Sequence, residues 1–209
     1  MGLDAIELWI ARLGAFAGLV TLAFAILAMF RALQQPTGRE EHGARLALRA
    51  PALLVATLLF IAVGALLWRP IPIQPHGWLR ALLLATATPL FFGGLALYLW
   101  GMRSLGQMFG PSSGFGVRLH AKHRLVTRGP YGLVRHPMYL GVIFTAIGSL
   151  LIYRTWASLG FAIIMFGLAV RARREEAILS QEFGSEWETY TSRVPPWLPR
   201  LRARKAGAA

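Results

Sequence analysis

Three groups of polar side chains in the C-terminal half could carry out chemistry at a membrane surface. An arginine and a histidine stand directly before a proline, in Arg135-His136-Pro137, and two adjacent glutamates follow at Glu175 and Glu176. Arg193 lies just before two further prolines. Proline favours the first position of a helix, because its ring sets the backbone angle and its missing N–H would have no partner there. The N–H groups after His136 are therefore a suitable site for a carboxylate or a phosphate.

Each of these groups also has an ordinary structural interpretation. Taken alone, the residues around Pro137 fit a plain helix start with an interfacial arginine better than an anion site. Arg171 and Glu175 can form an i,i+4 ion pair while Glu176 is solvated. What favours a functional site is the combination, because the loop before Pro137 and the tail after Arg171 supply carboxylates, histidine, arginine and tyrosine at one membrane face.

The elements that position these groups are predicted to be membrane helices. The chain has 209 residues, of which 56% are hydrophobic and only 15% are charged. Five stretches carry no charged residue, and a bilayer core requires about 20 helical residues. The stretches are Leu13–Phe30, Ala50–Trp68, Ala81–Met102, Pro137–Tyr153 and Thr155–Val170. The chain contains no cysteine, which excludes thiol nucleophiles, disulfides and thiolate metal sites.

We therefore predict an all-α, polytopic membrane protein with about five transmembrane helices. Arg154 alone separates the last two stretches, which predicts a tight helical hairpin whose charged tip reaches the interface. The final helix is predicted to continue to Phe183, where Gly184 stops it. We expect the N-terminal helices to occupy residues 1–102 and a C-terminal core to occupy residues 103–209. Two buried helices of a soluble protein would explain the last two stretches but not the three longer ones.

The distribution of basic residues predicts the orientation in the membrane. Eighteen of the 22 Lys and Arg residues fall in three segments that lie on the same side if there are five spans. Cytoplasmic loops accumulate Lys and Arg, so we expect the N-terminus outside and the C-terminus, with the polar groups, in the cytoplasm. The net charge of +13 could also suggest nucleic acid. No basic face interleaved with aromatic residues appears outside the stretches, so we set that interpretation aside.

At these polar groups the sequence resembles the isoprenylcysteine carboxyl methyltransferase family and the related membrane phospholipid methyltransferases. The resemblance covers roughly the C-terminal half of the chain. It implies a bacterial-type member of the family, and we expect the protein in a bacterial inner membrane. It consists of five blocks in the same order: Leu125-Val126-Thr127-x-Gly129-Pro130-Tyr131, Arg135-His136-Pro137-x-Tyr139-x-Gly141, Glu175-Glu176-x-x-Leu179, Phe183-Gly184-x-x-Trp187-x-x-Tyr190 and Arg193-Val194-Pro195-x-x-Leu198-Pro199.

The resemblance implies an enzyme that uses S-adenosyl-L-methionine and needs no metal. The carboxylate of this cofactor suits His136 and the helix start, and its cationic groups suit a glutamate and an aromatic face such as Tyr139. The matched positions expected to bind the cofactor are Tyr131, Arg135, His136, Pro137, Tyr139, Gly141, Glu175 and Tyr190. The matched positions expected to act in catalysis are Glu176 and Arg193.

The implied acceptor is a lipid or another lipophilic molecule, with either an isoprenylcysteine-like carboxylate or a phospholipid-like headgroup. Arg193 could hold an anionic group of this acceptor with its planar fork of donors. A carboxylate acceptor requires no general base, whereas an ammonium acceptor must first lose a proton. The sequence leaves the acceptor open, and it leaves the oligomeric state open as well.

Two other functions remain open at this stage. Sterol reductases share a similar Arg-His-Pro-x-Tyr-x-Gly block but use NADPH and usually have more spans. The Glu175-Glu176 pair and the five-span length favour the methyltransferase over the reductase. A non-catalytic membrane subunit is the second alternative, and it predicts a polar end without affinity for a cofactor.

Overall fold

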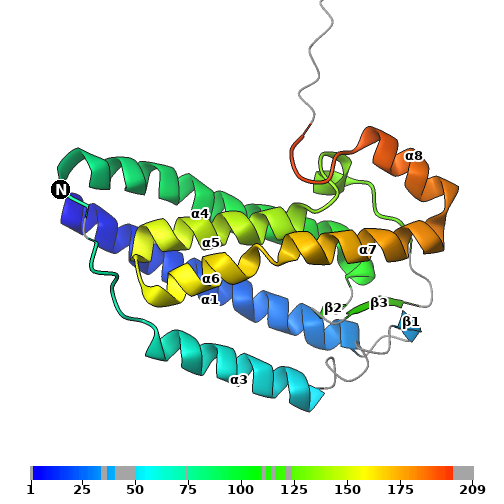
Figure 1. The fold of residues 1–209 in the computed structure, drawn as a ribbon, viewed down its shortest axis with the longest axis horizontal. Coiled ribbons are helices and arrows are strands. Elements are labelled where there is room, and N and C mark those ends of the chain that lie inside the picture. Colours follow the sequence, from blue (N-terminus) through cyan, green and yellow to red (C-terminus); the bar gives the residue numbers. More distant parts are fainter. Residues whose placement is uncertain are drawn as a thin grey trace, which may run out of the picture.

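The computed structural model is an elongated bundle of helices with α8 folded back over one end (Figure 1). It describes residues 2–33, 37–40, 50–73, 75–109, 112–113, 116–120 and 124–199. The helices of the bundle are α1 (Leu3–Leu33), α3 (Ala50–Leu66), α4 (Gly77–Leu105), α5 (Pro137–Tyr153) and α6 (Trp156–Met165). They are followed by α7 (Leu168–Phe183) and α8 (Ser185–Arg193). We call the end at which α7 and α8 lie the cap end.

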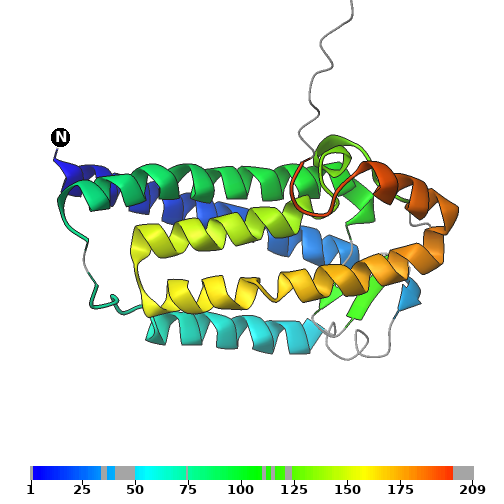
Figure 2. The same ribbon diagram turned by 45° about the horizontal axis from the view of Figure 1, so that its top comes forward.

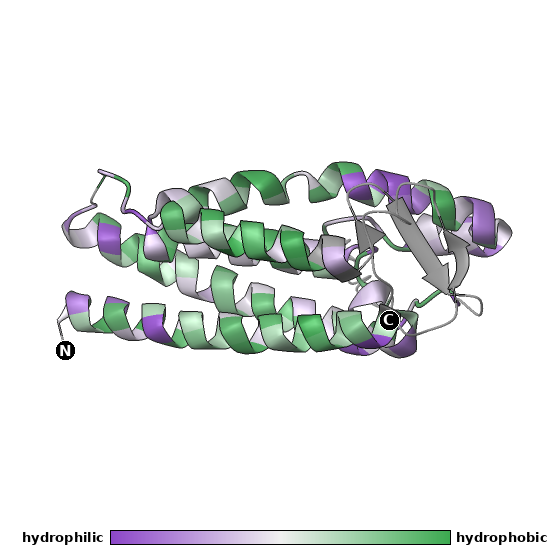
Figure 3. Cartoon of the chain, turned by 90° about the horizontal axis from the view of Figure 1, so that it is seen from below, coloured by the Kyte–Doolittle hydropathy of each residue, from purple (hydrophilic) through white to green (hydrophobic). Residues whose placement is uncertain are grey.

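The lengths and surfaces of these helices suit a membrane. Three segments are long and apolar enough to cross one, namely Leu3–Ala32, Gly77–Met108 and Trp156–Phe183, and α3 and α5 are shorter apolar helices. Many large apolar side chains are exposed, which is stable when lipid surrounds them. Figure 3 shows apolar residues along the middle of the bundle and hydrophilic residues gathered towards its ends. The chain is an integral, all-α polytopic membrane protein, as predicted.

The predicted hairpin is present between α5 and α6. Arg154 has a left-handed backbone conformation, with φ of 49°, and ends α5. Thr155 then caps α6, because its side chain accepts the N–H of Ser158 while the Ser158 hydroxyl accepts the N–H of Thr155. A left-handed residue followed by a capping box reverses the chain within a few residues.

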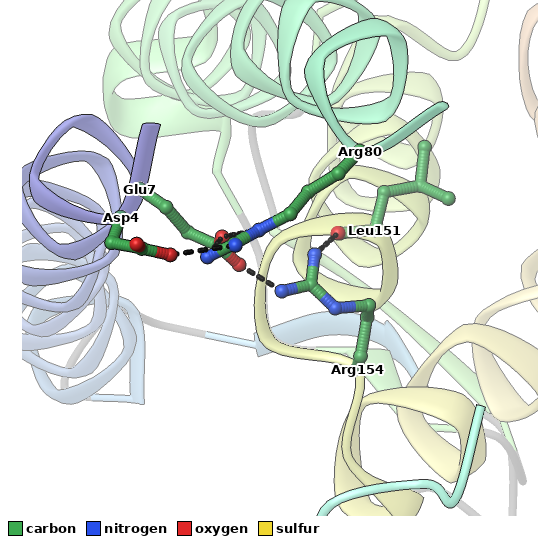
Figure 4. A network of polar contacts seen from close by, with 5 residues as sticks. All are labelled: Asp4, Glu7, Arg80, Leu151 and Arg154. Carbon is green, nitrogen blue, oxygen red and sulfur yellow. Dashed lines mark hydrogen bonds and ion pairs between the residues drawn. The ribbon is translucent and has the colours of Figure 1, made fainter. Parts of the chain in front are cut away.

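The side chain of Arg154 forms an ion pair with Glu7 of α1 (Figure 4), and its position at the membrane interface stays a prediction. It also donates to the carbonyl oxygen of Leu151, at 3.0 Å. Glu7 pairs in addition with Arg80 of α4, and Arg80 reaches Asp4 at 2.6 Å. A largely buried guanidinium needs a carboxylate partner, and here that partner comes from the other end of the sequence. The network joins α1, α4 and the hairpin at the end opposite the cap end.

The predicted final helix is interrupted at Phe166 and Gly167, between α6 and α7. The N–H groups of Ala169 and Val170 bond to the carbonyl oxygens of Phe166 and Gly167, three residues earlier, which is a tightened turn. Glycine inside a helix costs about 1 kcal/mol relative to alanine, so this is where the helix deforms most easily. The predicted stop is confirmed, because Gly184 ends α7 with φ of 48°.

A small antiparallel sheet is an addition that the sequence did not predict. Its strands are β1 (Thr37–Glu40), β2 (Ser112–Ser113) and β3 (Gly116–His120), in the order β1-β3-β2. Thr37 pairs with His120 and Glu40 with Arg118. The sheet therefore joins the connection after α1 to the connection after α4, and Figure 1 shows it near the end of α1.

Helices α4 and α5 lie side by side in Figures 1 and 2 and pack through glycines. A Cβ added to Gly94 would lie 2.6 Å from the carbonyl oxygen of Gly141, and one added to Gly148 would lie 2.6 Å from the backbone nitrogen of Phe91. Small residues allow the backbones of two membrane helices to come into contact. The hydrophobic effect does not drive helix association in lipid, so dispersion and weak hydrogen bonds between the close backbones stabilise the pair.

We predict that Gly148→Ala destabilises the bundle by about 1–3 kcal/mol, because the added methyl group would meet the backbone of α4. Gly160→Ala is the matched control, since Gly160 lies inside α6 with no other atom within 4 Å of an added Cβ. The control is expected to be neutral or stabilising by up to about 1 kcal/mol. Thermal unfolding followed by circular dichroism in detergent measures both, and equal midpoints for the two variants would contradict the packing described here.

Candidate functional site

The cap end encloses a cavity of about 370 Å³ between helices that are distant in the sequence. Its polar lining consists of Tyr98, Arg124, Tyr131, Arg135, His136, Tyr139, Arg171, Glu175 and Tyr190. Its apolar lining includes Met29, Leu105, Met108, Met138, Val142, Met165 and Leu168. The contributing elements are α1, α4, the short helices η1 (Gly106–Met108) and η2 (Gly129–Gly132), the loop before η2, α5, α6, α7 and α8. One cavity thus combines charged and aromatic groups with side chains of the membrane helices.

The start of α5 is held by the chain that follows α8. His136 precedes the first helical residue, Pro137, as predicted. The N–H of Arg135 donates to the carbonyl oxygen of Pro195, at 2.9 Å, and the N–H of His136 donates to that of Pro196, at 3.2 Å. The C-terminal segment therefore lies across the start of α5, so Arg135 and His136 have little freedom to move.

Glu176 of α7 binds both of these residues through one carboxylate. Its Oε1 lies 2.7 Å from Nε2 of His136, and its Oε2 lies 3.1 Å from Nη1 of Arg135. An ionised carboxylate only accepts hydrogen bonds, so Nε2 of His136 carries the proton. Glu176 is not the solvated residue of the ordinary interpretation, because it fixes α7 against the start of α5.

Glu175 points away from this ion pair and lines the cavity. Its Oε2 accepts a hydrogen bond of 2.7 Å from the hydroxyl of Tyr139. The ring of Tyr139 stacks on His136, with 5.5 Å between centroids and an angle of 2°, and the Arg171 guanidinium lies 5.6 Å from the centroid of Tyr139. Successive residues of a helix point about 100° apart. The two adjacent glutamates therefore have different partners: Glu175 faces the cavity, and Glu176 binds Arg135 and His136.

The last helix closes the cavity with aromatic side chains. Trp187, Tyr190 and Val194 form a buried cluster that packs on α7 and on Leu125. The hydroxyl of Tyr190 donates to the carbonyl oxygen of Tyr131, at 2.8 Å. Burial raises the pKa of Tyr190 to about 12, and burial together with the charge of Glu175 raises the pKa of Tyr131 well above its usual value. Both hydroxyls are therefore protonated donors at neutral pH.

The structure brings six of the ten predicted site residues to the cavity lining: Tyr131, Arg135, His136, Tyr139, Glu175 and Tyr190. The other four lie outside the lining. Pro137 and Gly141 are buried, and a Cβ on Gly141 would lie 2.8 Å from the backbone nitrogen of Tyr98, so Gly141 sets the distance between α5 and α4. Glu176 acts through Arg135 and His136, and Arg193 is exposed at the end of α8.

Sequence reasoning missed several lining residues, among them Tyr98, Arg171 and Met29. Tyr98 was detectable as a polar aromatic residue inside an otherwise apolar span. For Arg171 the sequence predicts only an i,i+4 pair with Glu175. Met29 carries no signal, because nothing in a run of apolar residues shows which one meets the cavity. Met29 and Tyr98 belong to the N-terminal side of the division at residue 102, which stays a prediction.

Comparisons with known proteins agree with the resemblance. A profile described as phospholipid methyltransferase matches residues 82–186, half of the chain. This range includes Tyr98, His136 and Glu175, and it ends before Tyr190 and Arg193.

Several curated relatives are isoprenylcysteine methyltransferases. The chain is 33% identical over 85 residues to protein-S-isoprenylcysteine O-methyltransferase B of Arabidopsis thaliana, covering 40% of this chain and 43% of that protein. It is 37% identical over 81 residues to the protein-S-isoprenylcysteine O-methyltransferase of Schizosaccharomyces pombe, covering 38% and 34%. It is 30% identical over 128 residues to that of Rattus norvegicus, covering 57% and 45%. The chain spans less than half the length of these relatives.

We predict that Tyr190→Phe lowers the free energy of unfolding by about 1 kcal/mol at pH 8, because the hydrogen bond to Tyr131 is lost. This difference disappears towards pH 11. The pKa of Tyr190 is about 12 in the folded chain and 10.0 for an unperturbed tyrosine, so the unfolded chain loses its proton first and the wild type loses stability as the pH rises from about 10 to 12. Chemical unfolding at the two pH values tests this, since the remaining tyrosines titrate in both proteins. A difference that does not change with pH would contradict it.

Proposed function

Because the chain belongs to the phospholipid methyltransferase family, we propose that it transfers a methyl group from S-adenosyl-L-methionine to a lipophilic acceptor in the membrane. The proposal depends on the position of Glu175, whose carboxylate lines the cavity beside aromatic rings. The same cavity also has an apolar lining formed by side chains of the membrane helices. When bound, S-adenosyl-L-methionine supplies a methyl group on a positively charged sulfur.

The lining residues fit this cofactor. The volume of about 370 Å³ lies within the usual range for small-molecule sites. Nε of Arg135 is buried and meets no hydrogen-bond acceptor among the described residues. A buried donor without a partner is costly, and the carboxylate of a ligand would satisfy it. Arg135 is therefore the group that we assign to the carboxylate of the cofactor, with Glu176 and His136 holding the arginine in place.

Glu175 is the group that we assign to the ammonium of the cofactor. Its carboxylate is oriented by Tyr139, and the charge of Glu175 suits a cation at the same place. The faces of Tyr98 and Tyr131, which line the cavity, attract a sulfonium through their ring quadrupoles. What these residues contribute to the rate is alignment, because a displacement at carbon requires the attacking atom, the methyl carbon and the sulfur to lie in line.

The apolar lining is the part that we assign to the acceptor. Most of its methionines and leucines come from α1, α4, α5, α6 and α7, and they offer a hydrocarbon chain an environment like that of the bilayer. The relatives named above are isoprenylcysteine O-methyltransferases, which favours a carboxylate acceptor over an amine. A carboxylate needs no general base, and Glu176 is then a positioning residue rather than a base.

The positive-inside rule supports a cytoplasmic cap end, with the N-terminus outside. A water-soluble cofactor then enters from the cytoplasm, and the acceptor enters from the membrane. Arg193 lies at the exposed end of α8, where its guanidinium can meet an anionic group of the acceptor.

We predict that the purified protein binds S-adenosylhomocysteine in calorimetry and that Glu175→Gln weakens this binding by about tenfold to a hundredfold. The amide keeps the shape and can still accept from Tyr139, but it loses the charge that attracts an ammonium. Glu188→Gln is the matched control, because Glu188 is exposed on α8 and is absent from the lining. NADPH is titrated in parallel to test the reductase alternative. No binding of S-adenosylhomocysteine and S-adenosyl-L-methionine would refute the proposal.

We predict that Arg193→Gln leaves the affinity for S-adenosylhomocysteine unchanged and lowers methyl transfer by at least about tenfold, since only the acceptor loses a charge-assisted hydrogen bond. Arg173→Gln, at another exposed arginine, is the control. Transfer is measured with a labelled methyl donor and membrane lipids, followed by mass spectrometry of lipids from cells with and without the protein. An unchanged rate in Arg193→Gln would remove this residue from the acceptor site.

A further inference from the structure

A second cavity, of about 430 Å³, lies between the ends of α1 and α4. Apolar side chains from both helices form part of it, including Phe24 and Leu27 of α1 and Met102 of α4. Phe24 and Leu27 are more than half exposed, at 56% and 53%. We call this cavity the α1–α4 groove. Phe109 lines both the groove and the cavity of the candidate site, so the two are neighbours.

Two arginines stand at the cap end of the groove. Arg31 lies in the last turn of α1 and Arg103 in the last turn of α4, and both line the groove. The two helices run side by side in the same direction in Figures 1 and 2, so their last turns, with these arginines, lie at the same end of the groove. From Phe24 to Arg31 the helix rises by about 10 Å, which gives the groove an apolar part extending from the arginines towards the middle of the bundle.

Each arginine alone has a simple explanation. A cation near the C-terminus of a helix is stabilised by the helix dipole, and arginines accumulate on the cytoplasmic side of a membrane protein. Neither explanation requires arginines from two helices to share an apolar groove. The described residues that line the groove include no aspartate or glutamate, so the two positive charges have no acidic partner within it.

We propose that the α1–α4 groove binds one anionic phospholipid. Its phosphate lies between Arg31 and Arg103, because guanidinium groups bind phosphate oxygens with paired hydrogen bonds. One acyl chain lies along Phe24, Leu27 and Met102. Basic pockets between membrane helices on the cytoplasmic side suit anionic headgroups, whereas the quaternary ammonium of a zwitterionic lipid would meet the same arginines with an unfavourable charge. The site does not depend on methyl transfer, since it lies outside the cofactor cavity.

The full-length protein in detergent is incubated with phosphatidylglycerol or with phosphatidylcholine of matched acyl chains, and native mass spectrometry counts the bound lipid. We expect one phosphatidylglycerol to be retained in preference to phosphatidylcholine. The double substitution Arg31→Gln and Arg103→Gln is expected to weaken the retention of phosphatidylglycerol about 25-fold, because each arginine near an anionic lipid contributes about fivefold. The control, Arg12→Gln with Arg69→Gln, removes two exposed arginines that do not line the groove and is expected to retain the lipid.

A second variant tests the groove without changing its charge. Ala28 lines the groove, and Ala28→Phe fills it while both arginines remain. We expect this variant to lose phosphatidylglycerol as well, and we expect soluble glycerol 3-phosphate to compete poorly in the wild type because it lacks an acyl chain. Circular dichroism checks that each variant is folded. If the double arginine variant is not folded, Ala28→Phe and the competition with glycerol 3-phosphate test the proposal. Equal retention of the two lipids, unchanged retention in the folded variants, or full competition by glycerol 3-phosphate would overturn the proposal.

Discussion

The carboxylate of Glu176 is the contact on which the candidate site depends. It joins α7 to Arg135 and His136, forty residues earlier in the chain, and so fixes the angle at which α7 leaves the bundle. Glu175 then points to the cavity, and α8 can fold back over the start of α5. A buried histidine and a partly buried arginine share one carboxylate here, and removing that carboxylate would leave both partly desolvated and unpaired.

Close packing of α4 on α5 supplies the second constraint. Gly94 and Gly141 bring the two backbones to a distance that no side chain would allow, and Tyr98 reaches the cavity from the next turn of α4. The opposite end is closed by Glu7, which pairs with arginines of α4 and of the hairpin. In a membrane the apolar surfaces of the helices have little reason to prefer each other to lipid. Backbone contact and ion pairs at the two ends therefore decide the arrangement.

Two neighbouring cavities lie at the cap end. One has a polar lining suited to a water-soluble methyl donor, and the other combines two arginines with an apolar groove. Phe109 belongs to both, so a lipid in the proposed groove would lie against the wall of the proposed donor cavity. Occupants of such neighbouring cavities can influence each other's affinity through the shared side chain, and any such coupling is reciprocal.

The amino-acid sequence by itself determined the helical spans, the hairpin at Arg154, the start of α5 at Pro137 and the end of α7 at Gly184. These features depend on runs of apolar residues and on the backbone preferences of single residues, which are local properties. Through the family blocks the sequence also identified six of the polar residues that line the cavity, but not Tyr98, Arg124 or Arg171. Only the tertiary structure decided that Glu176 binds Arg135 and His136 and that Arg154 pairs with Glu7. It also decided that Gly141 allows α4 and α5 to pack closely and does not line the cavity. It also decided the pairing of β1 with β3. Each of these contacts joins residues that are far apart in the chain. Local sequence patterns do not identify such partners, because the fold decides which groups come together.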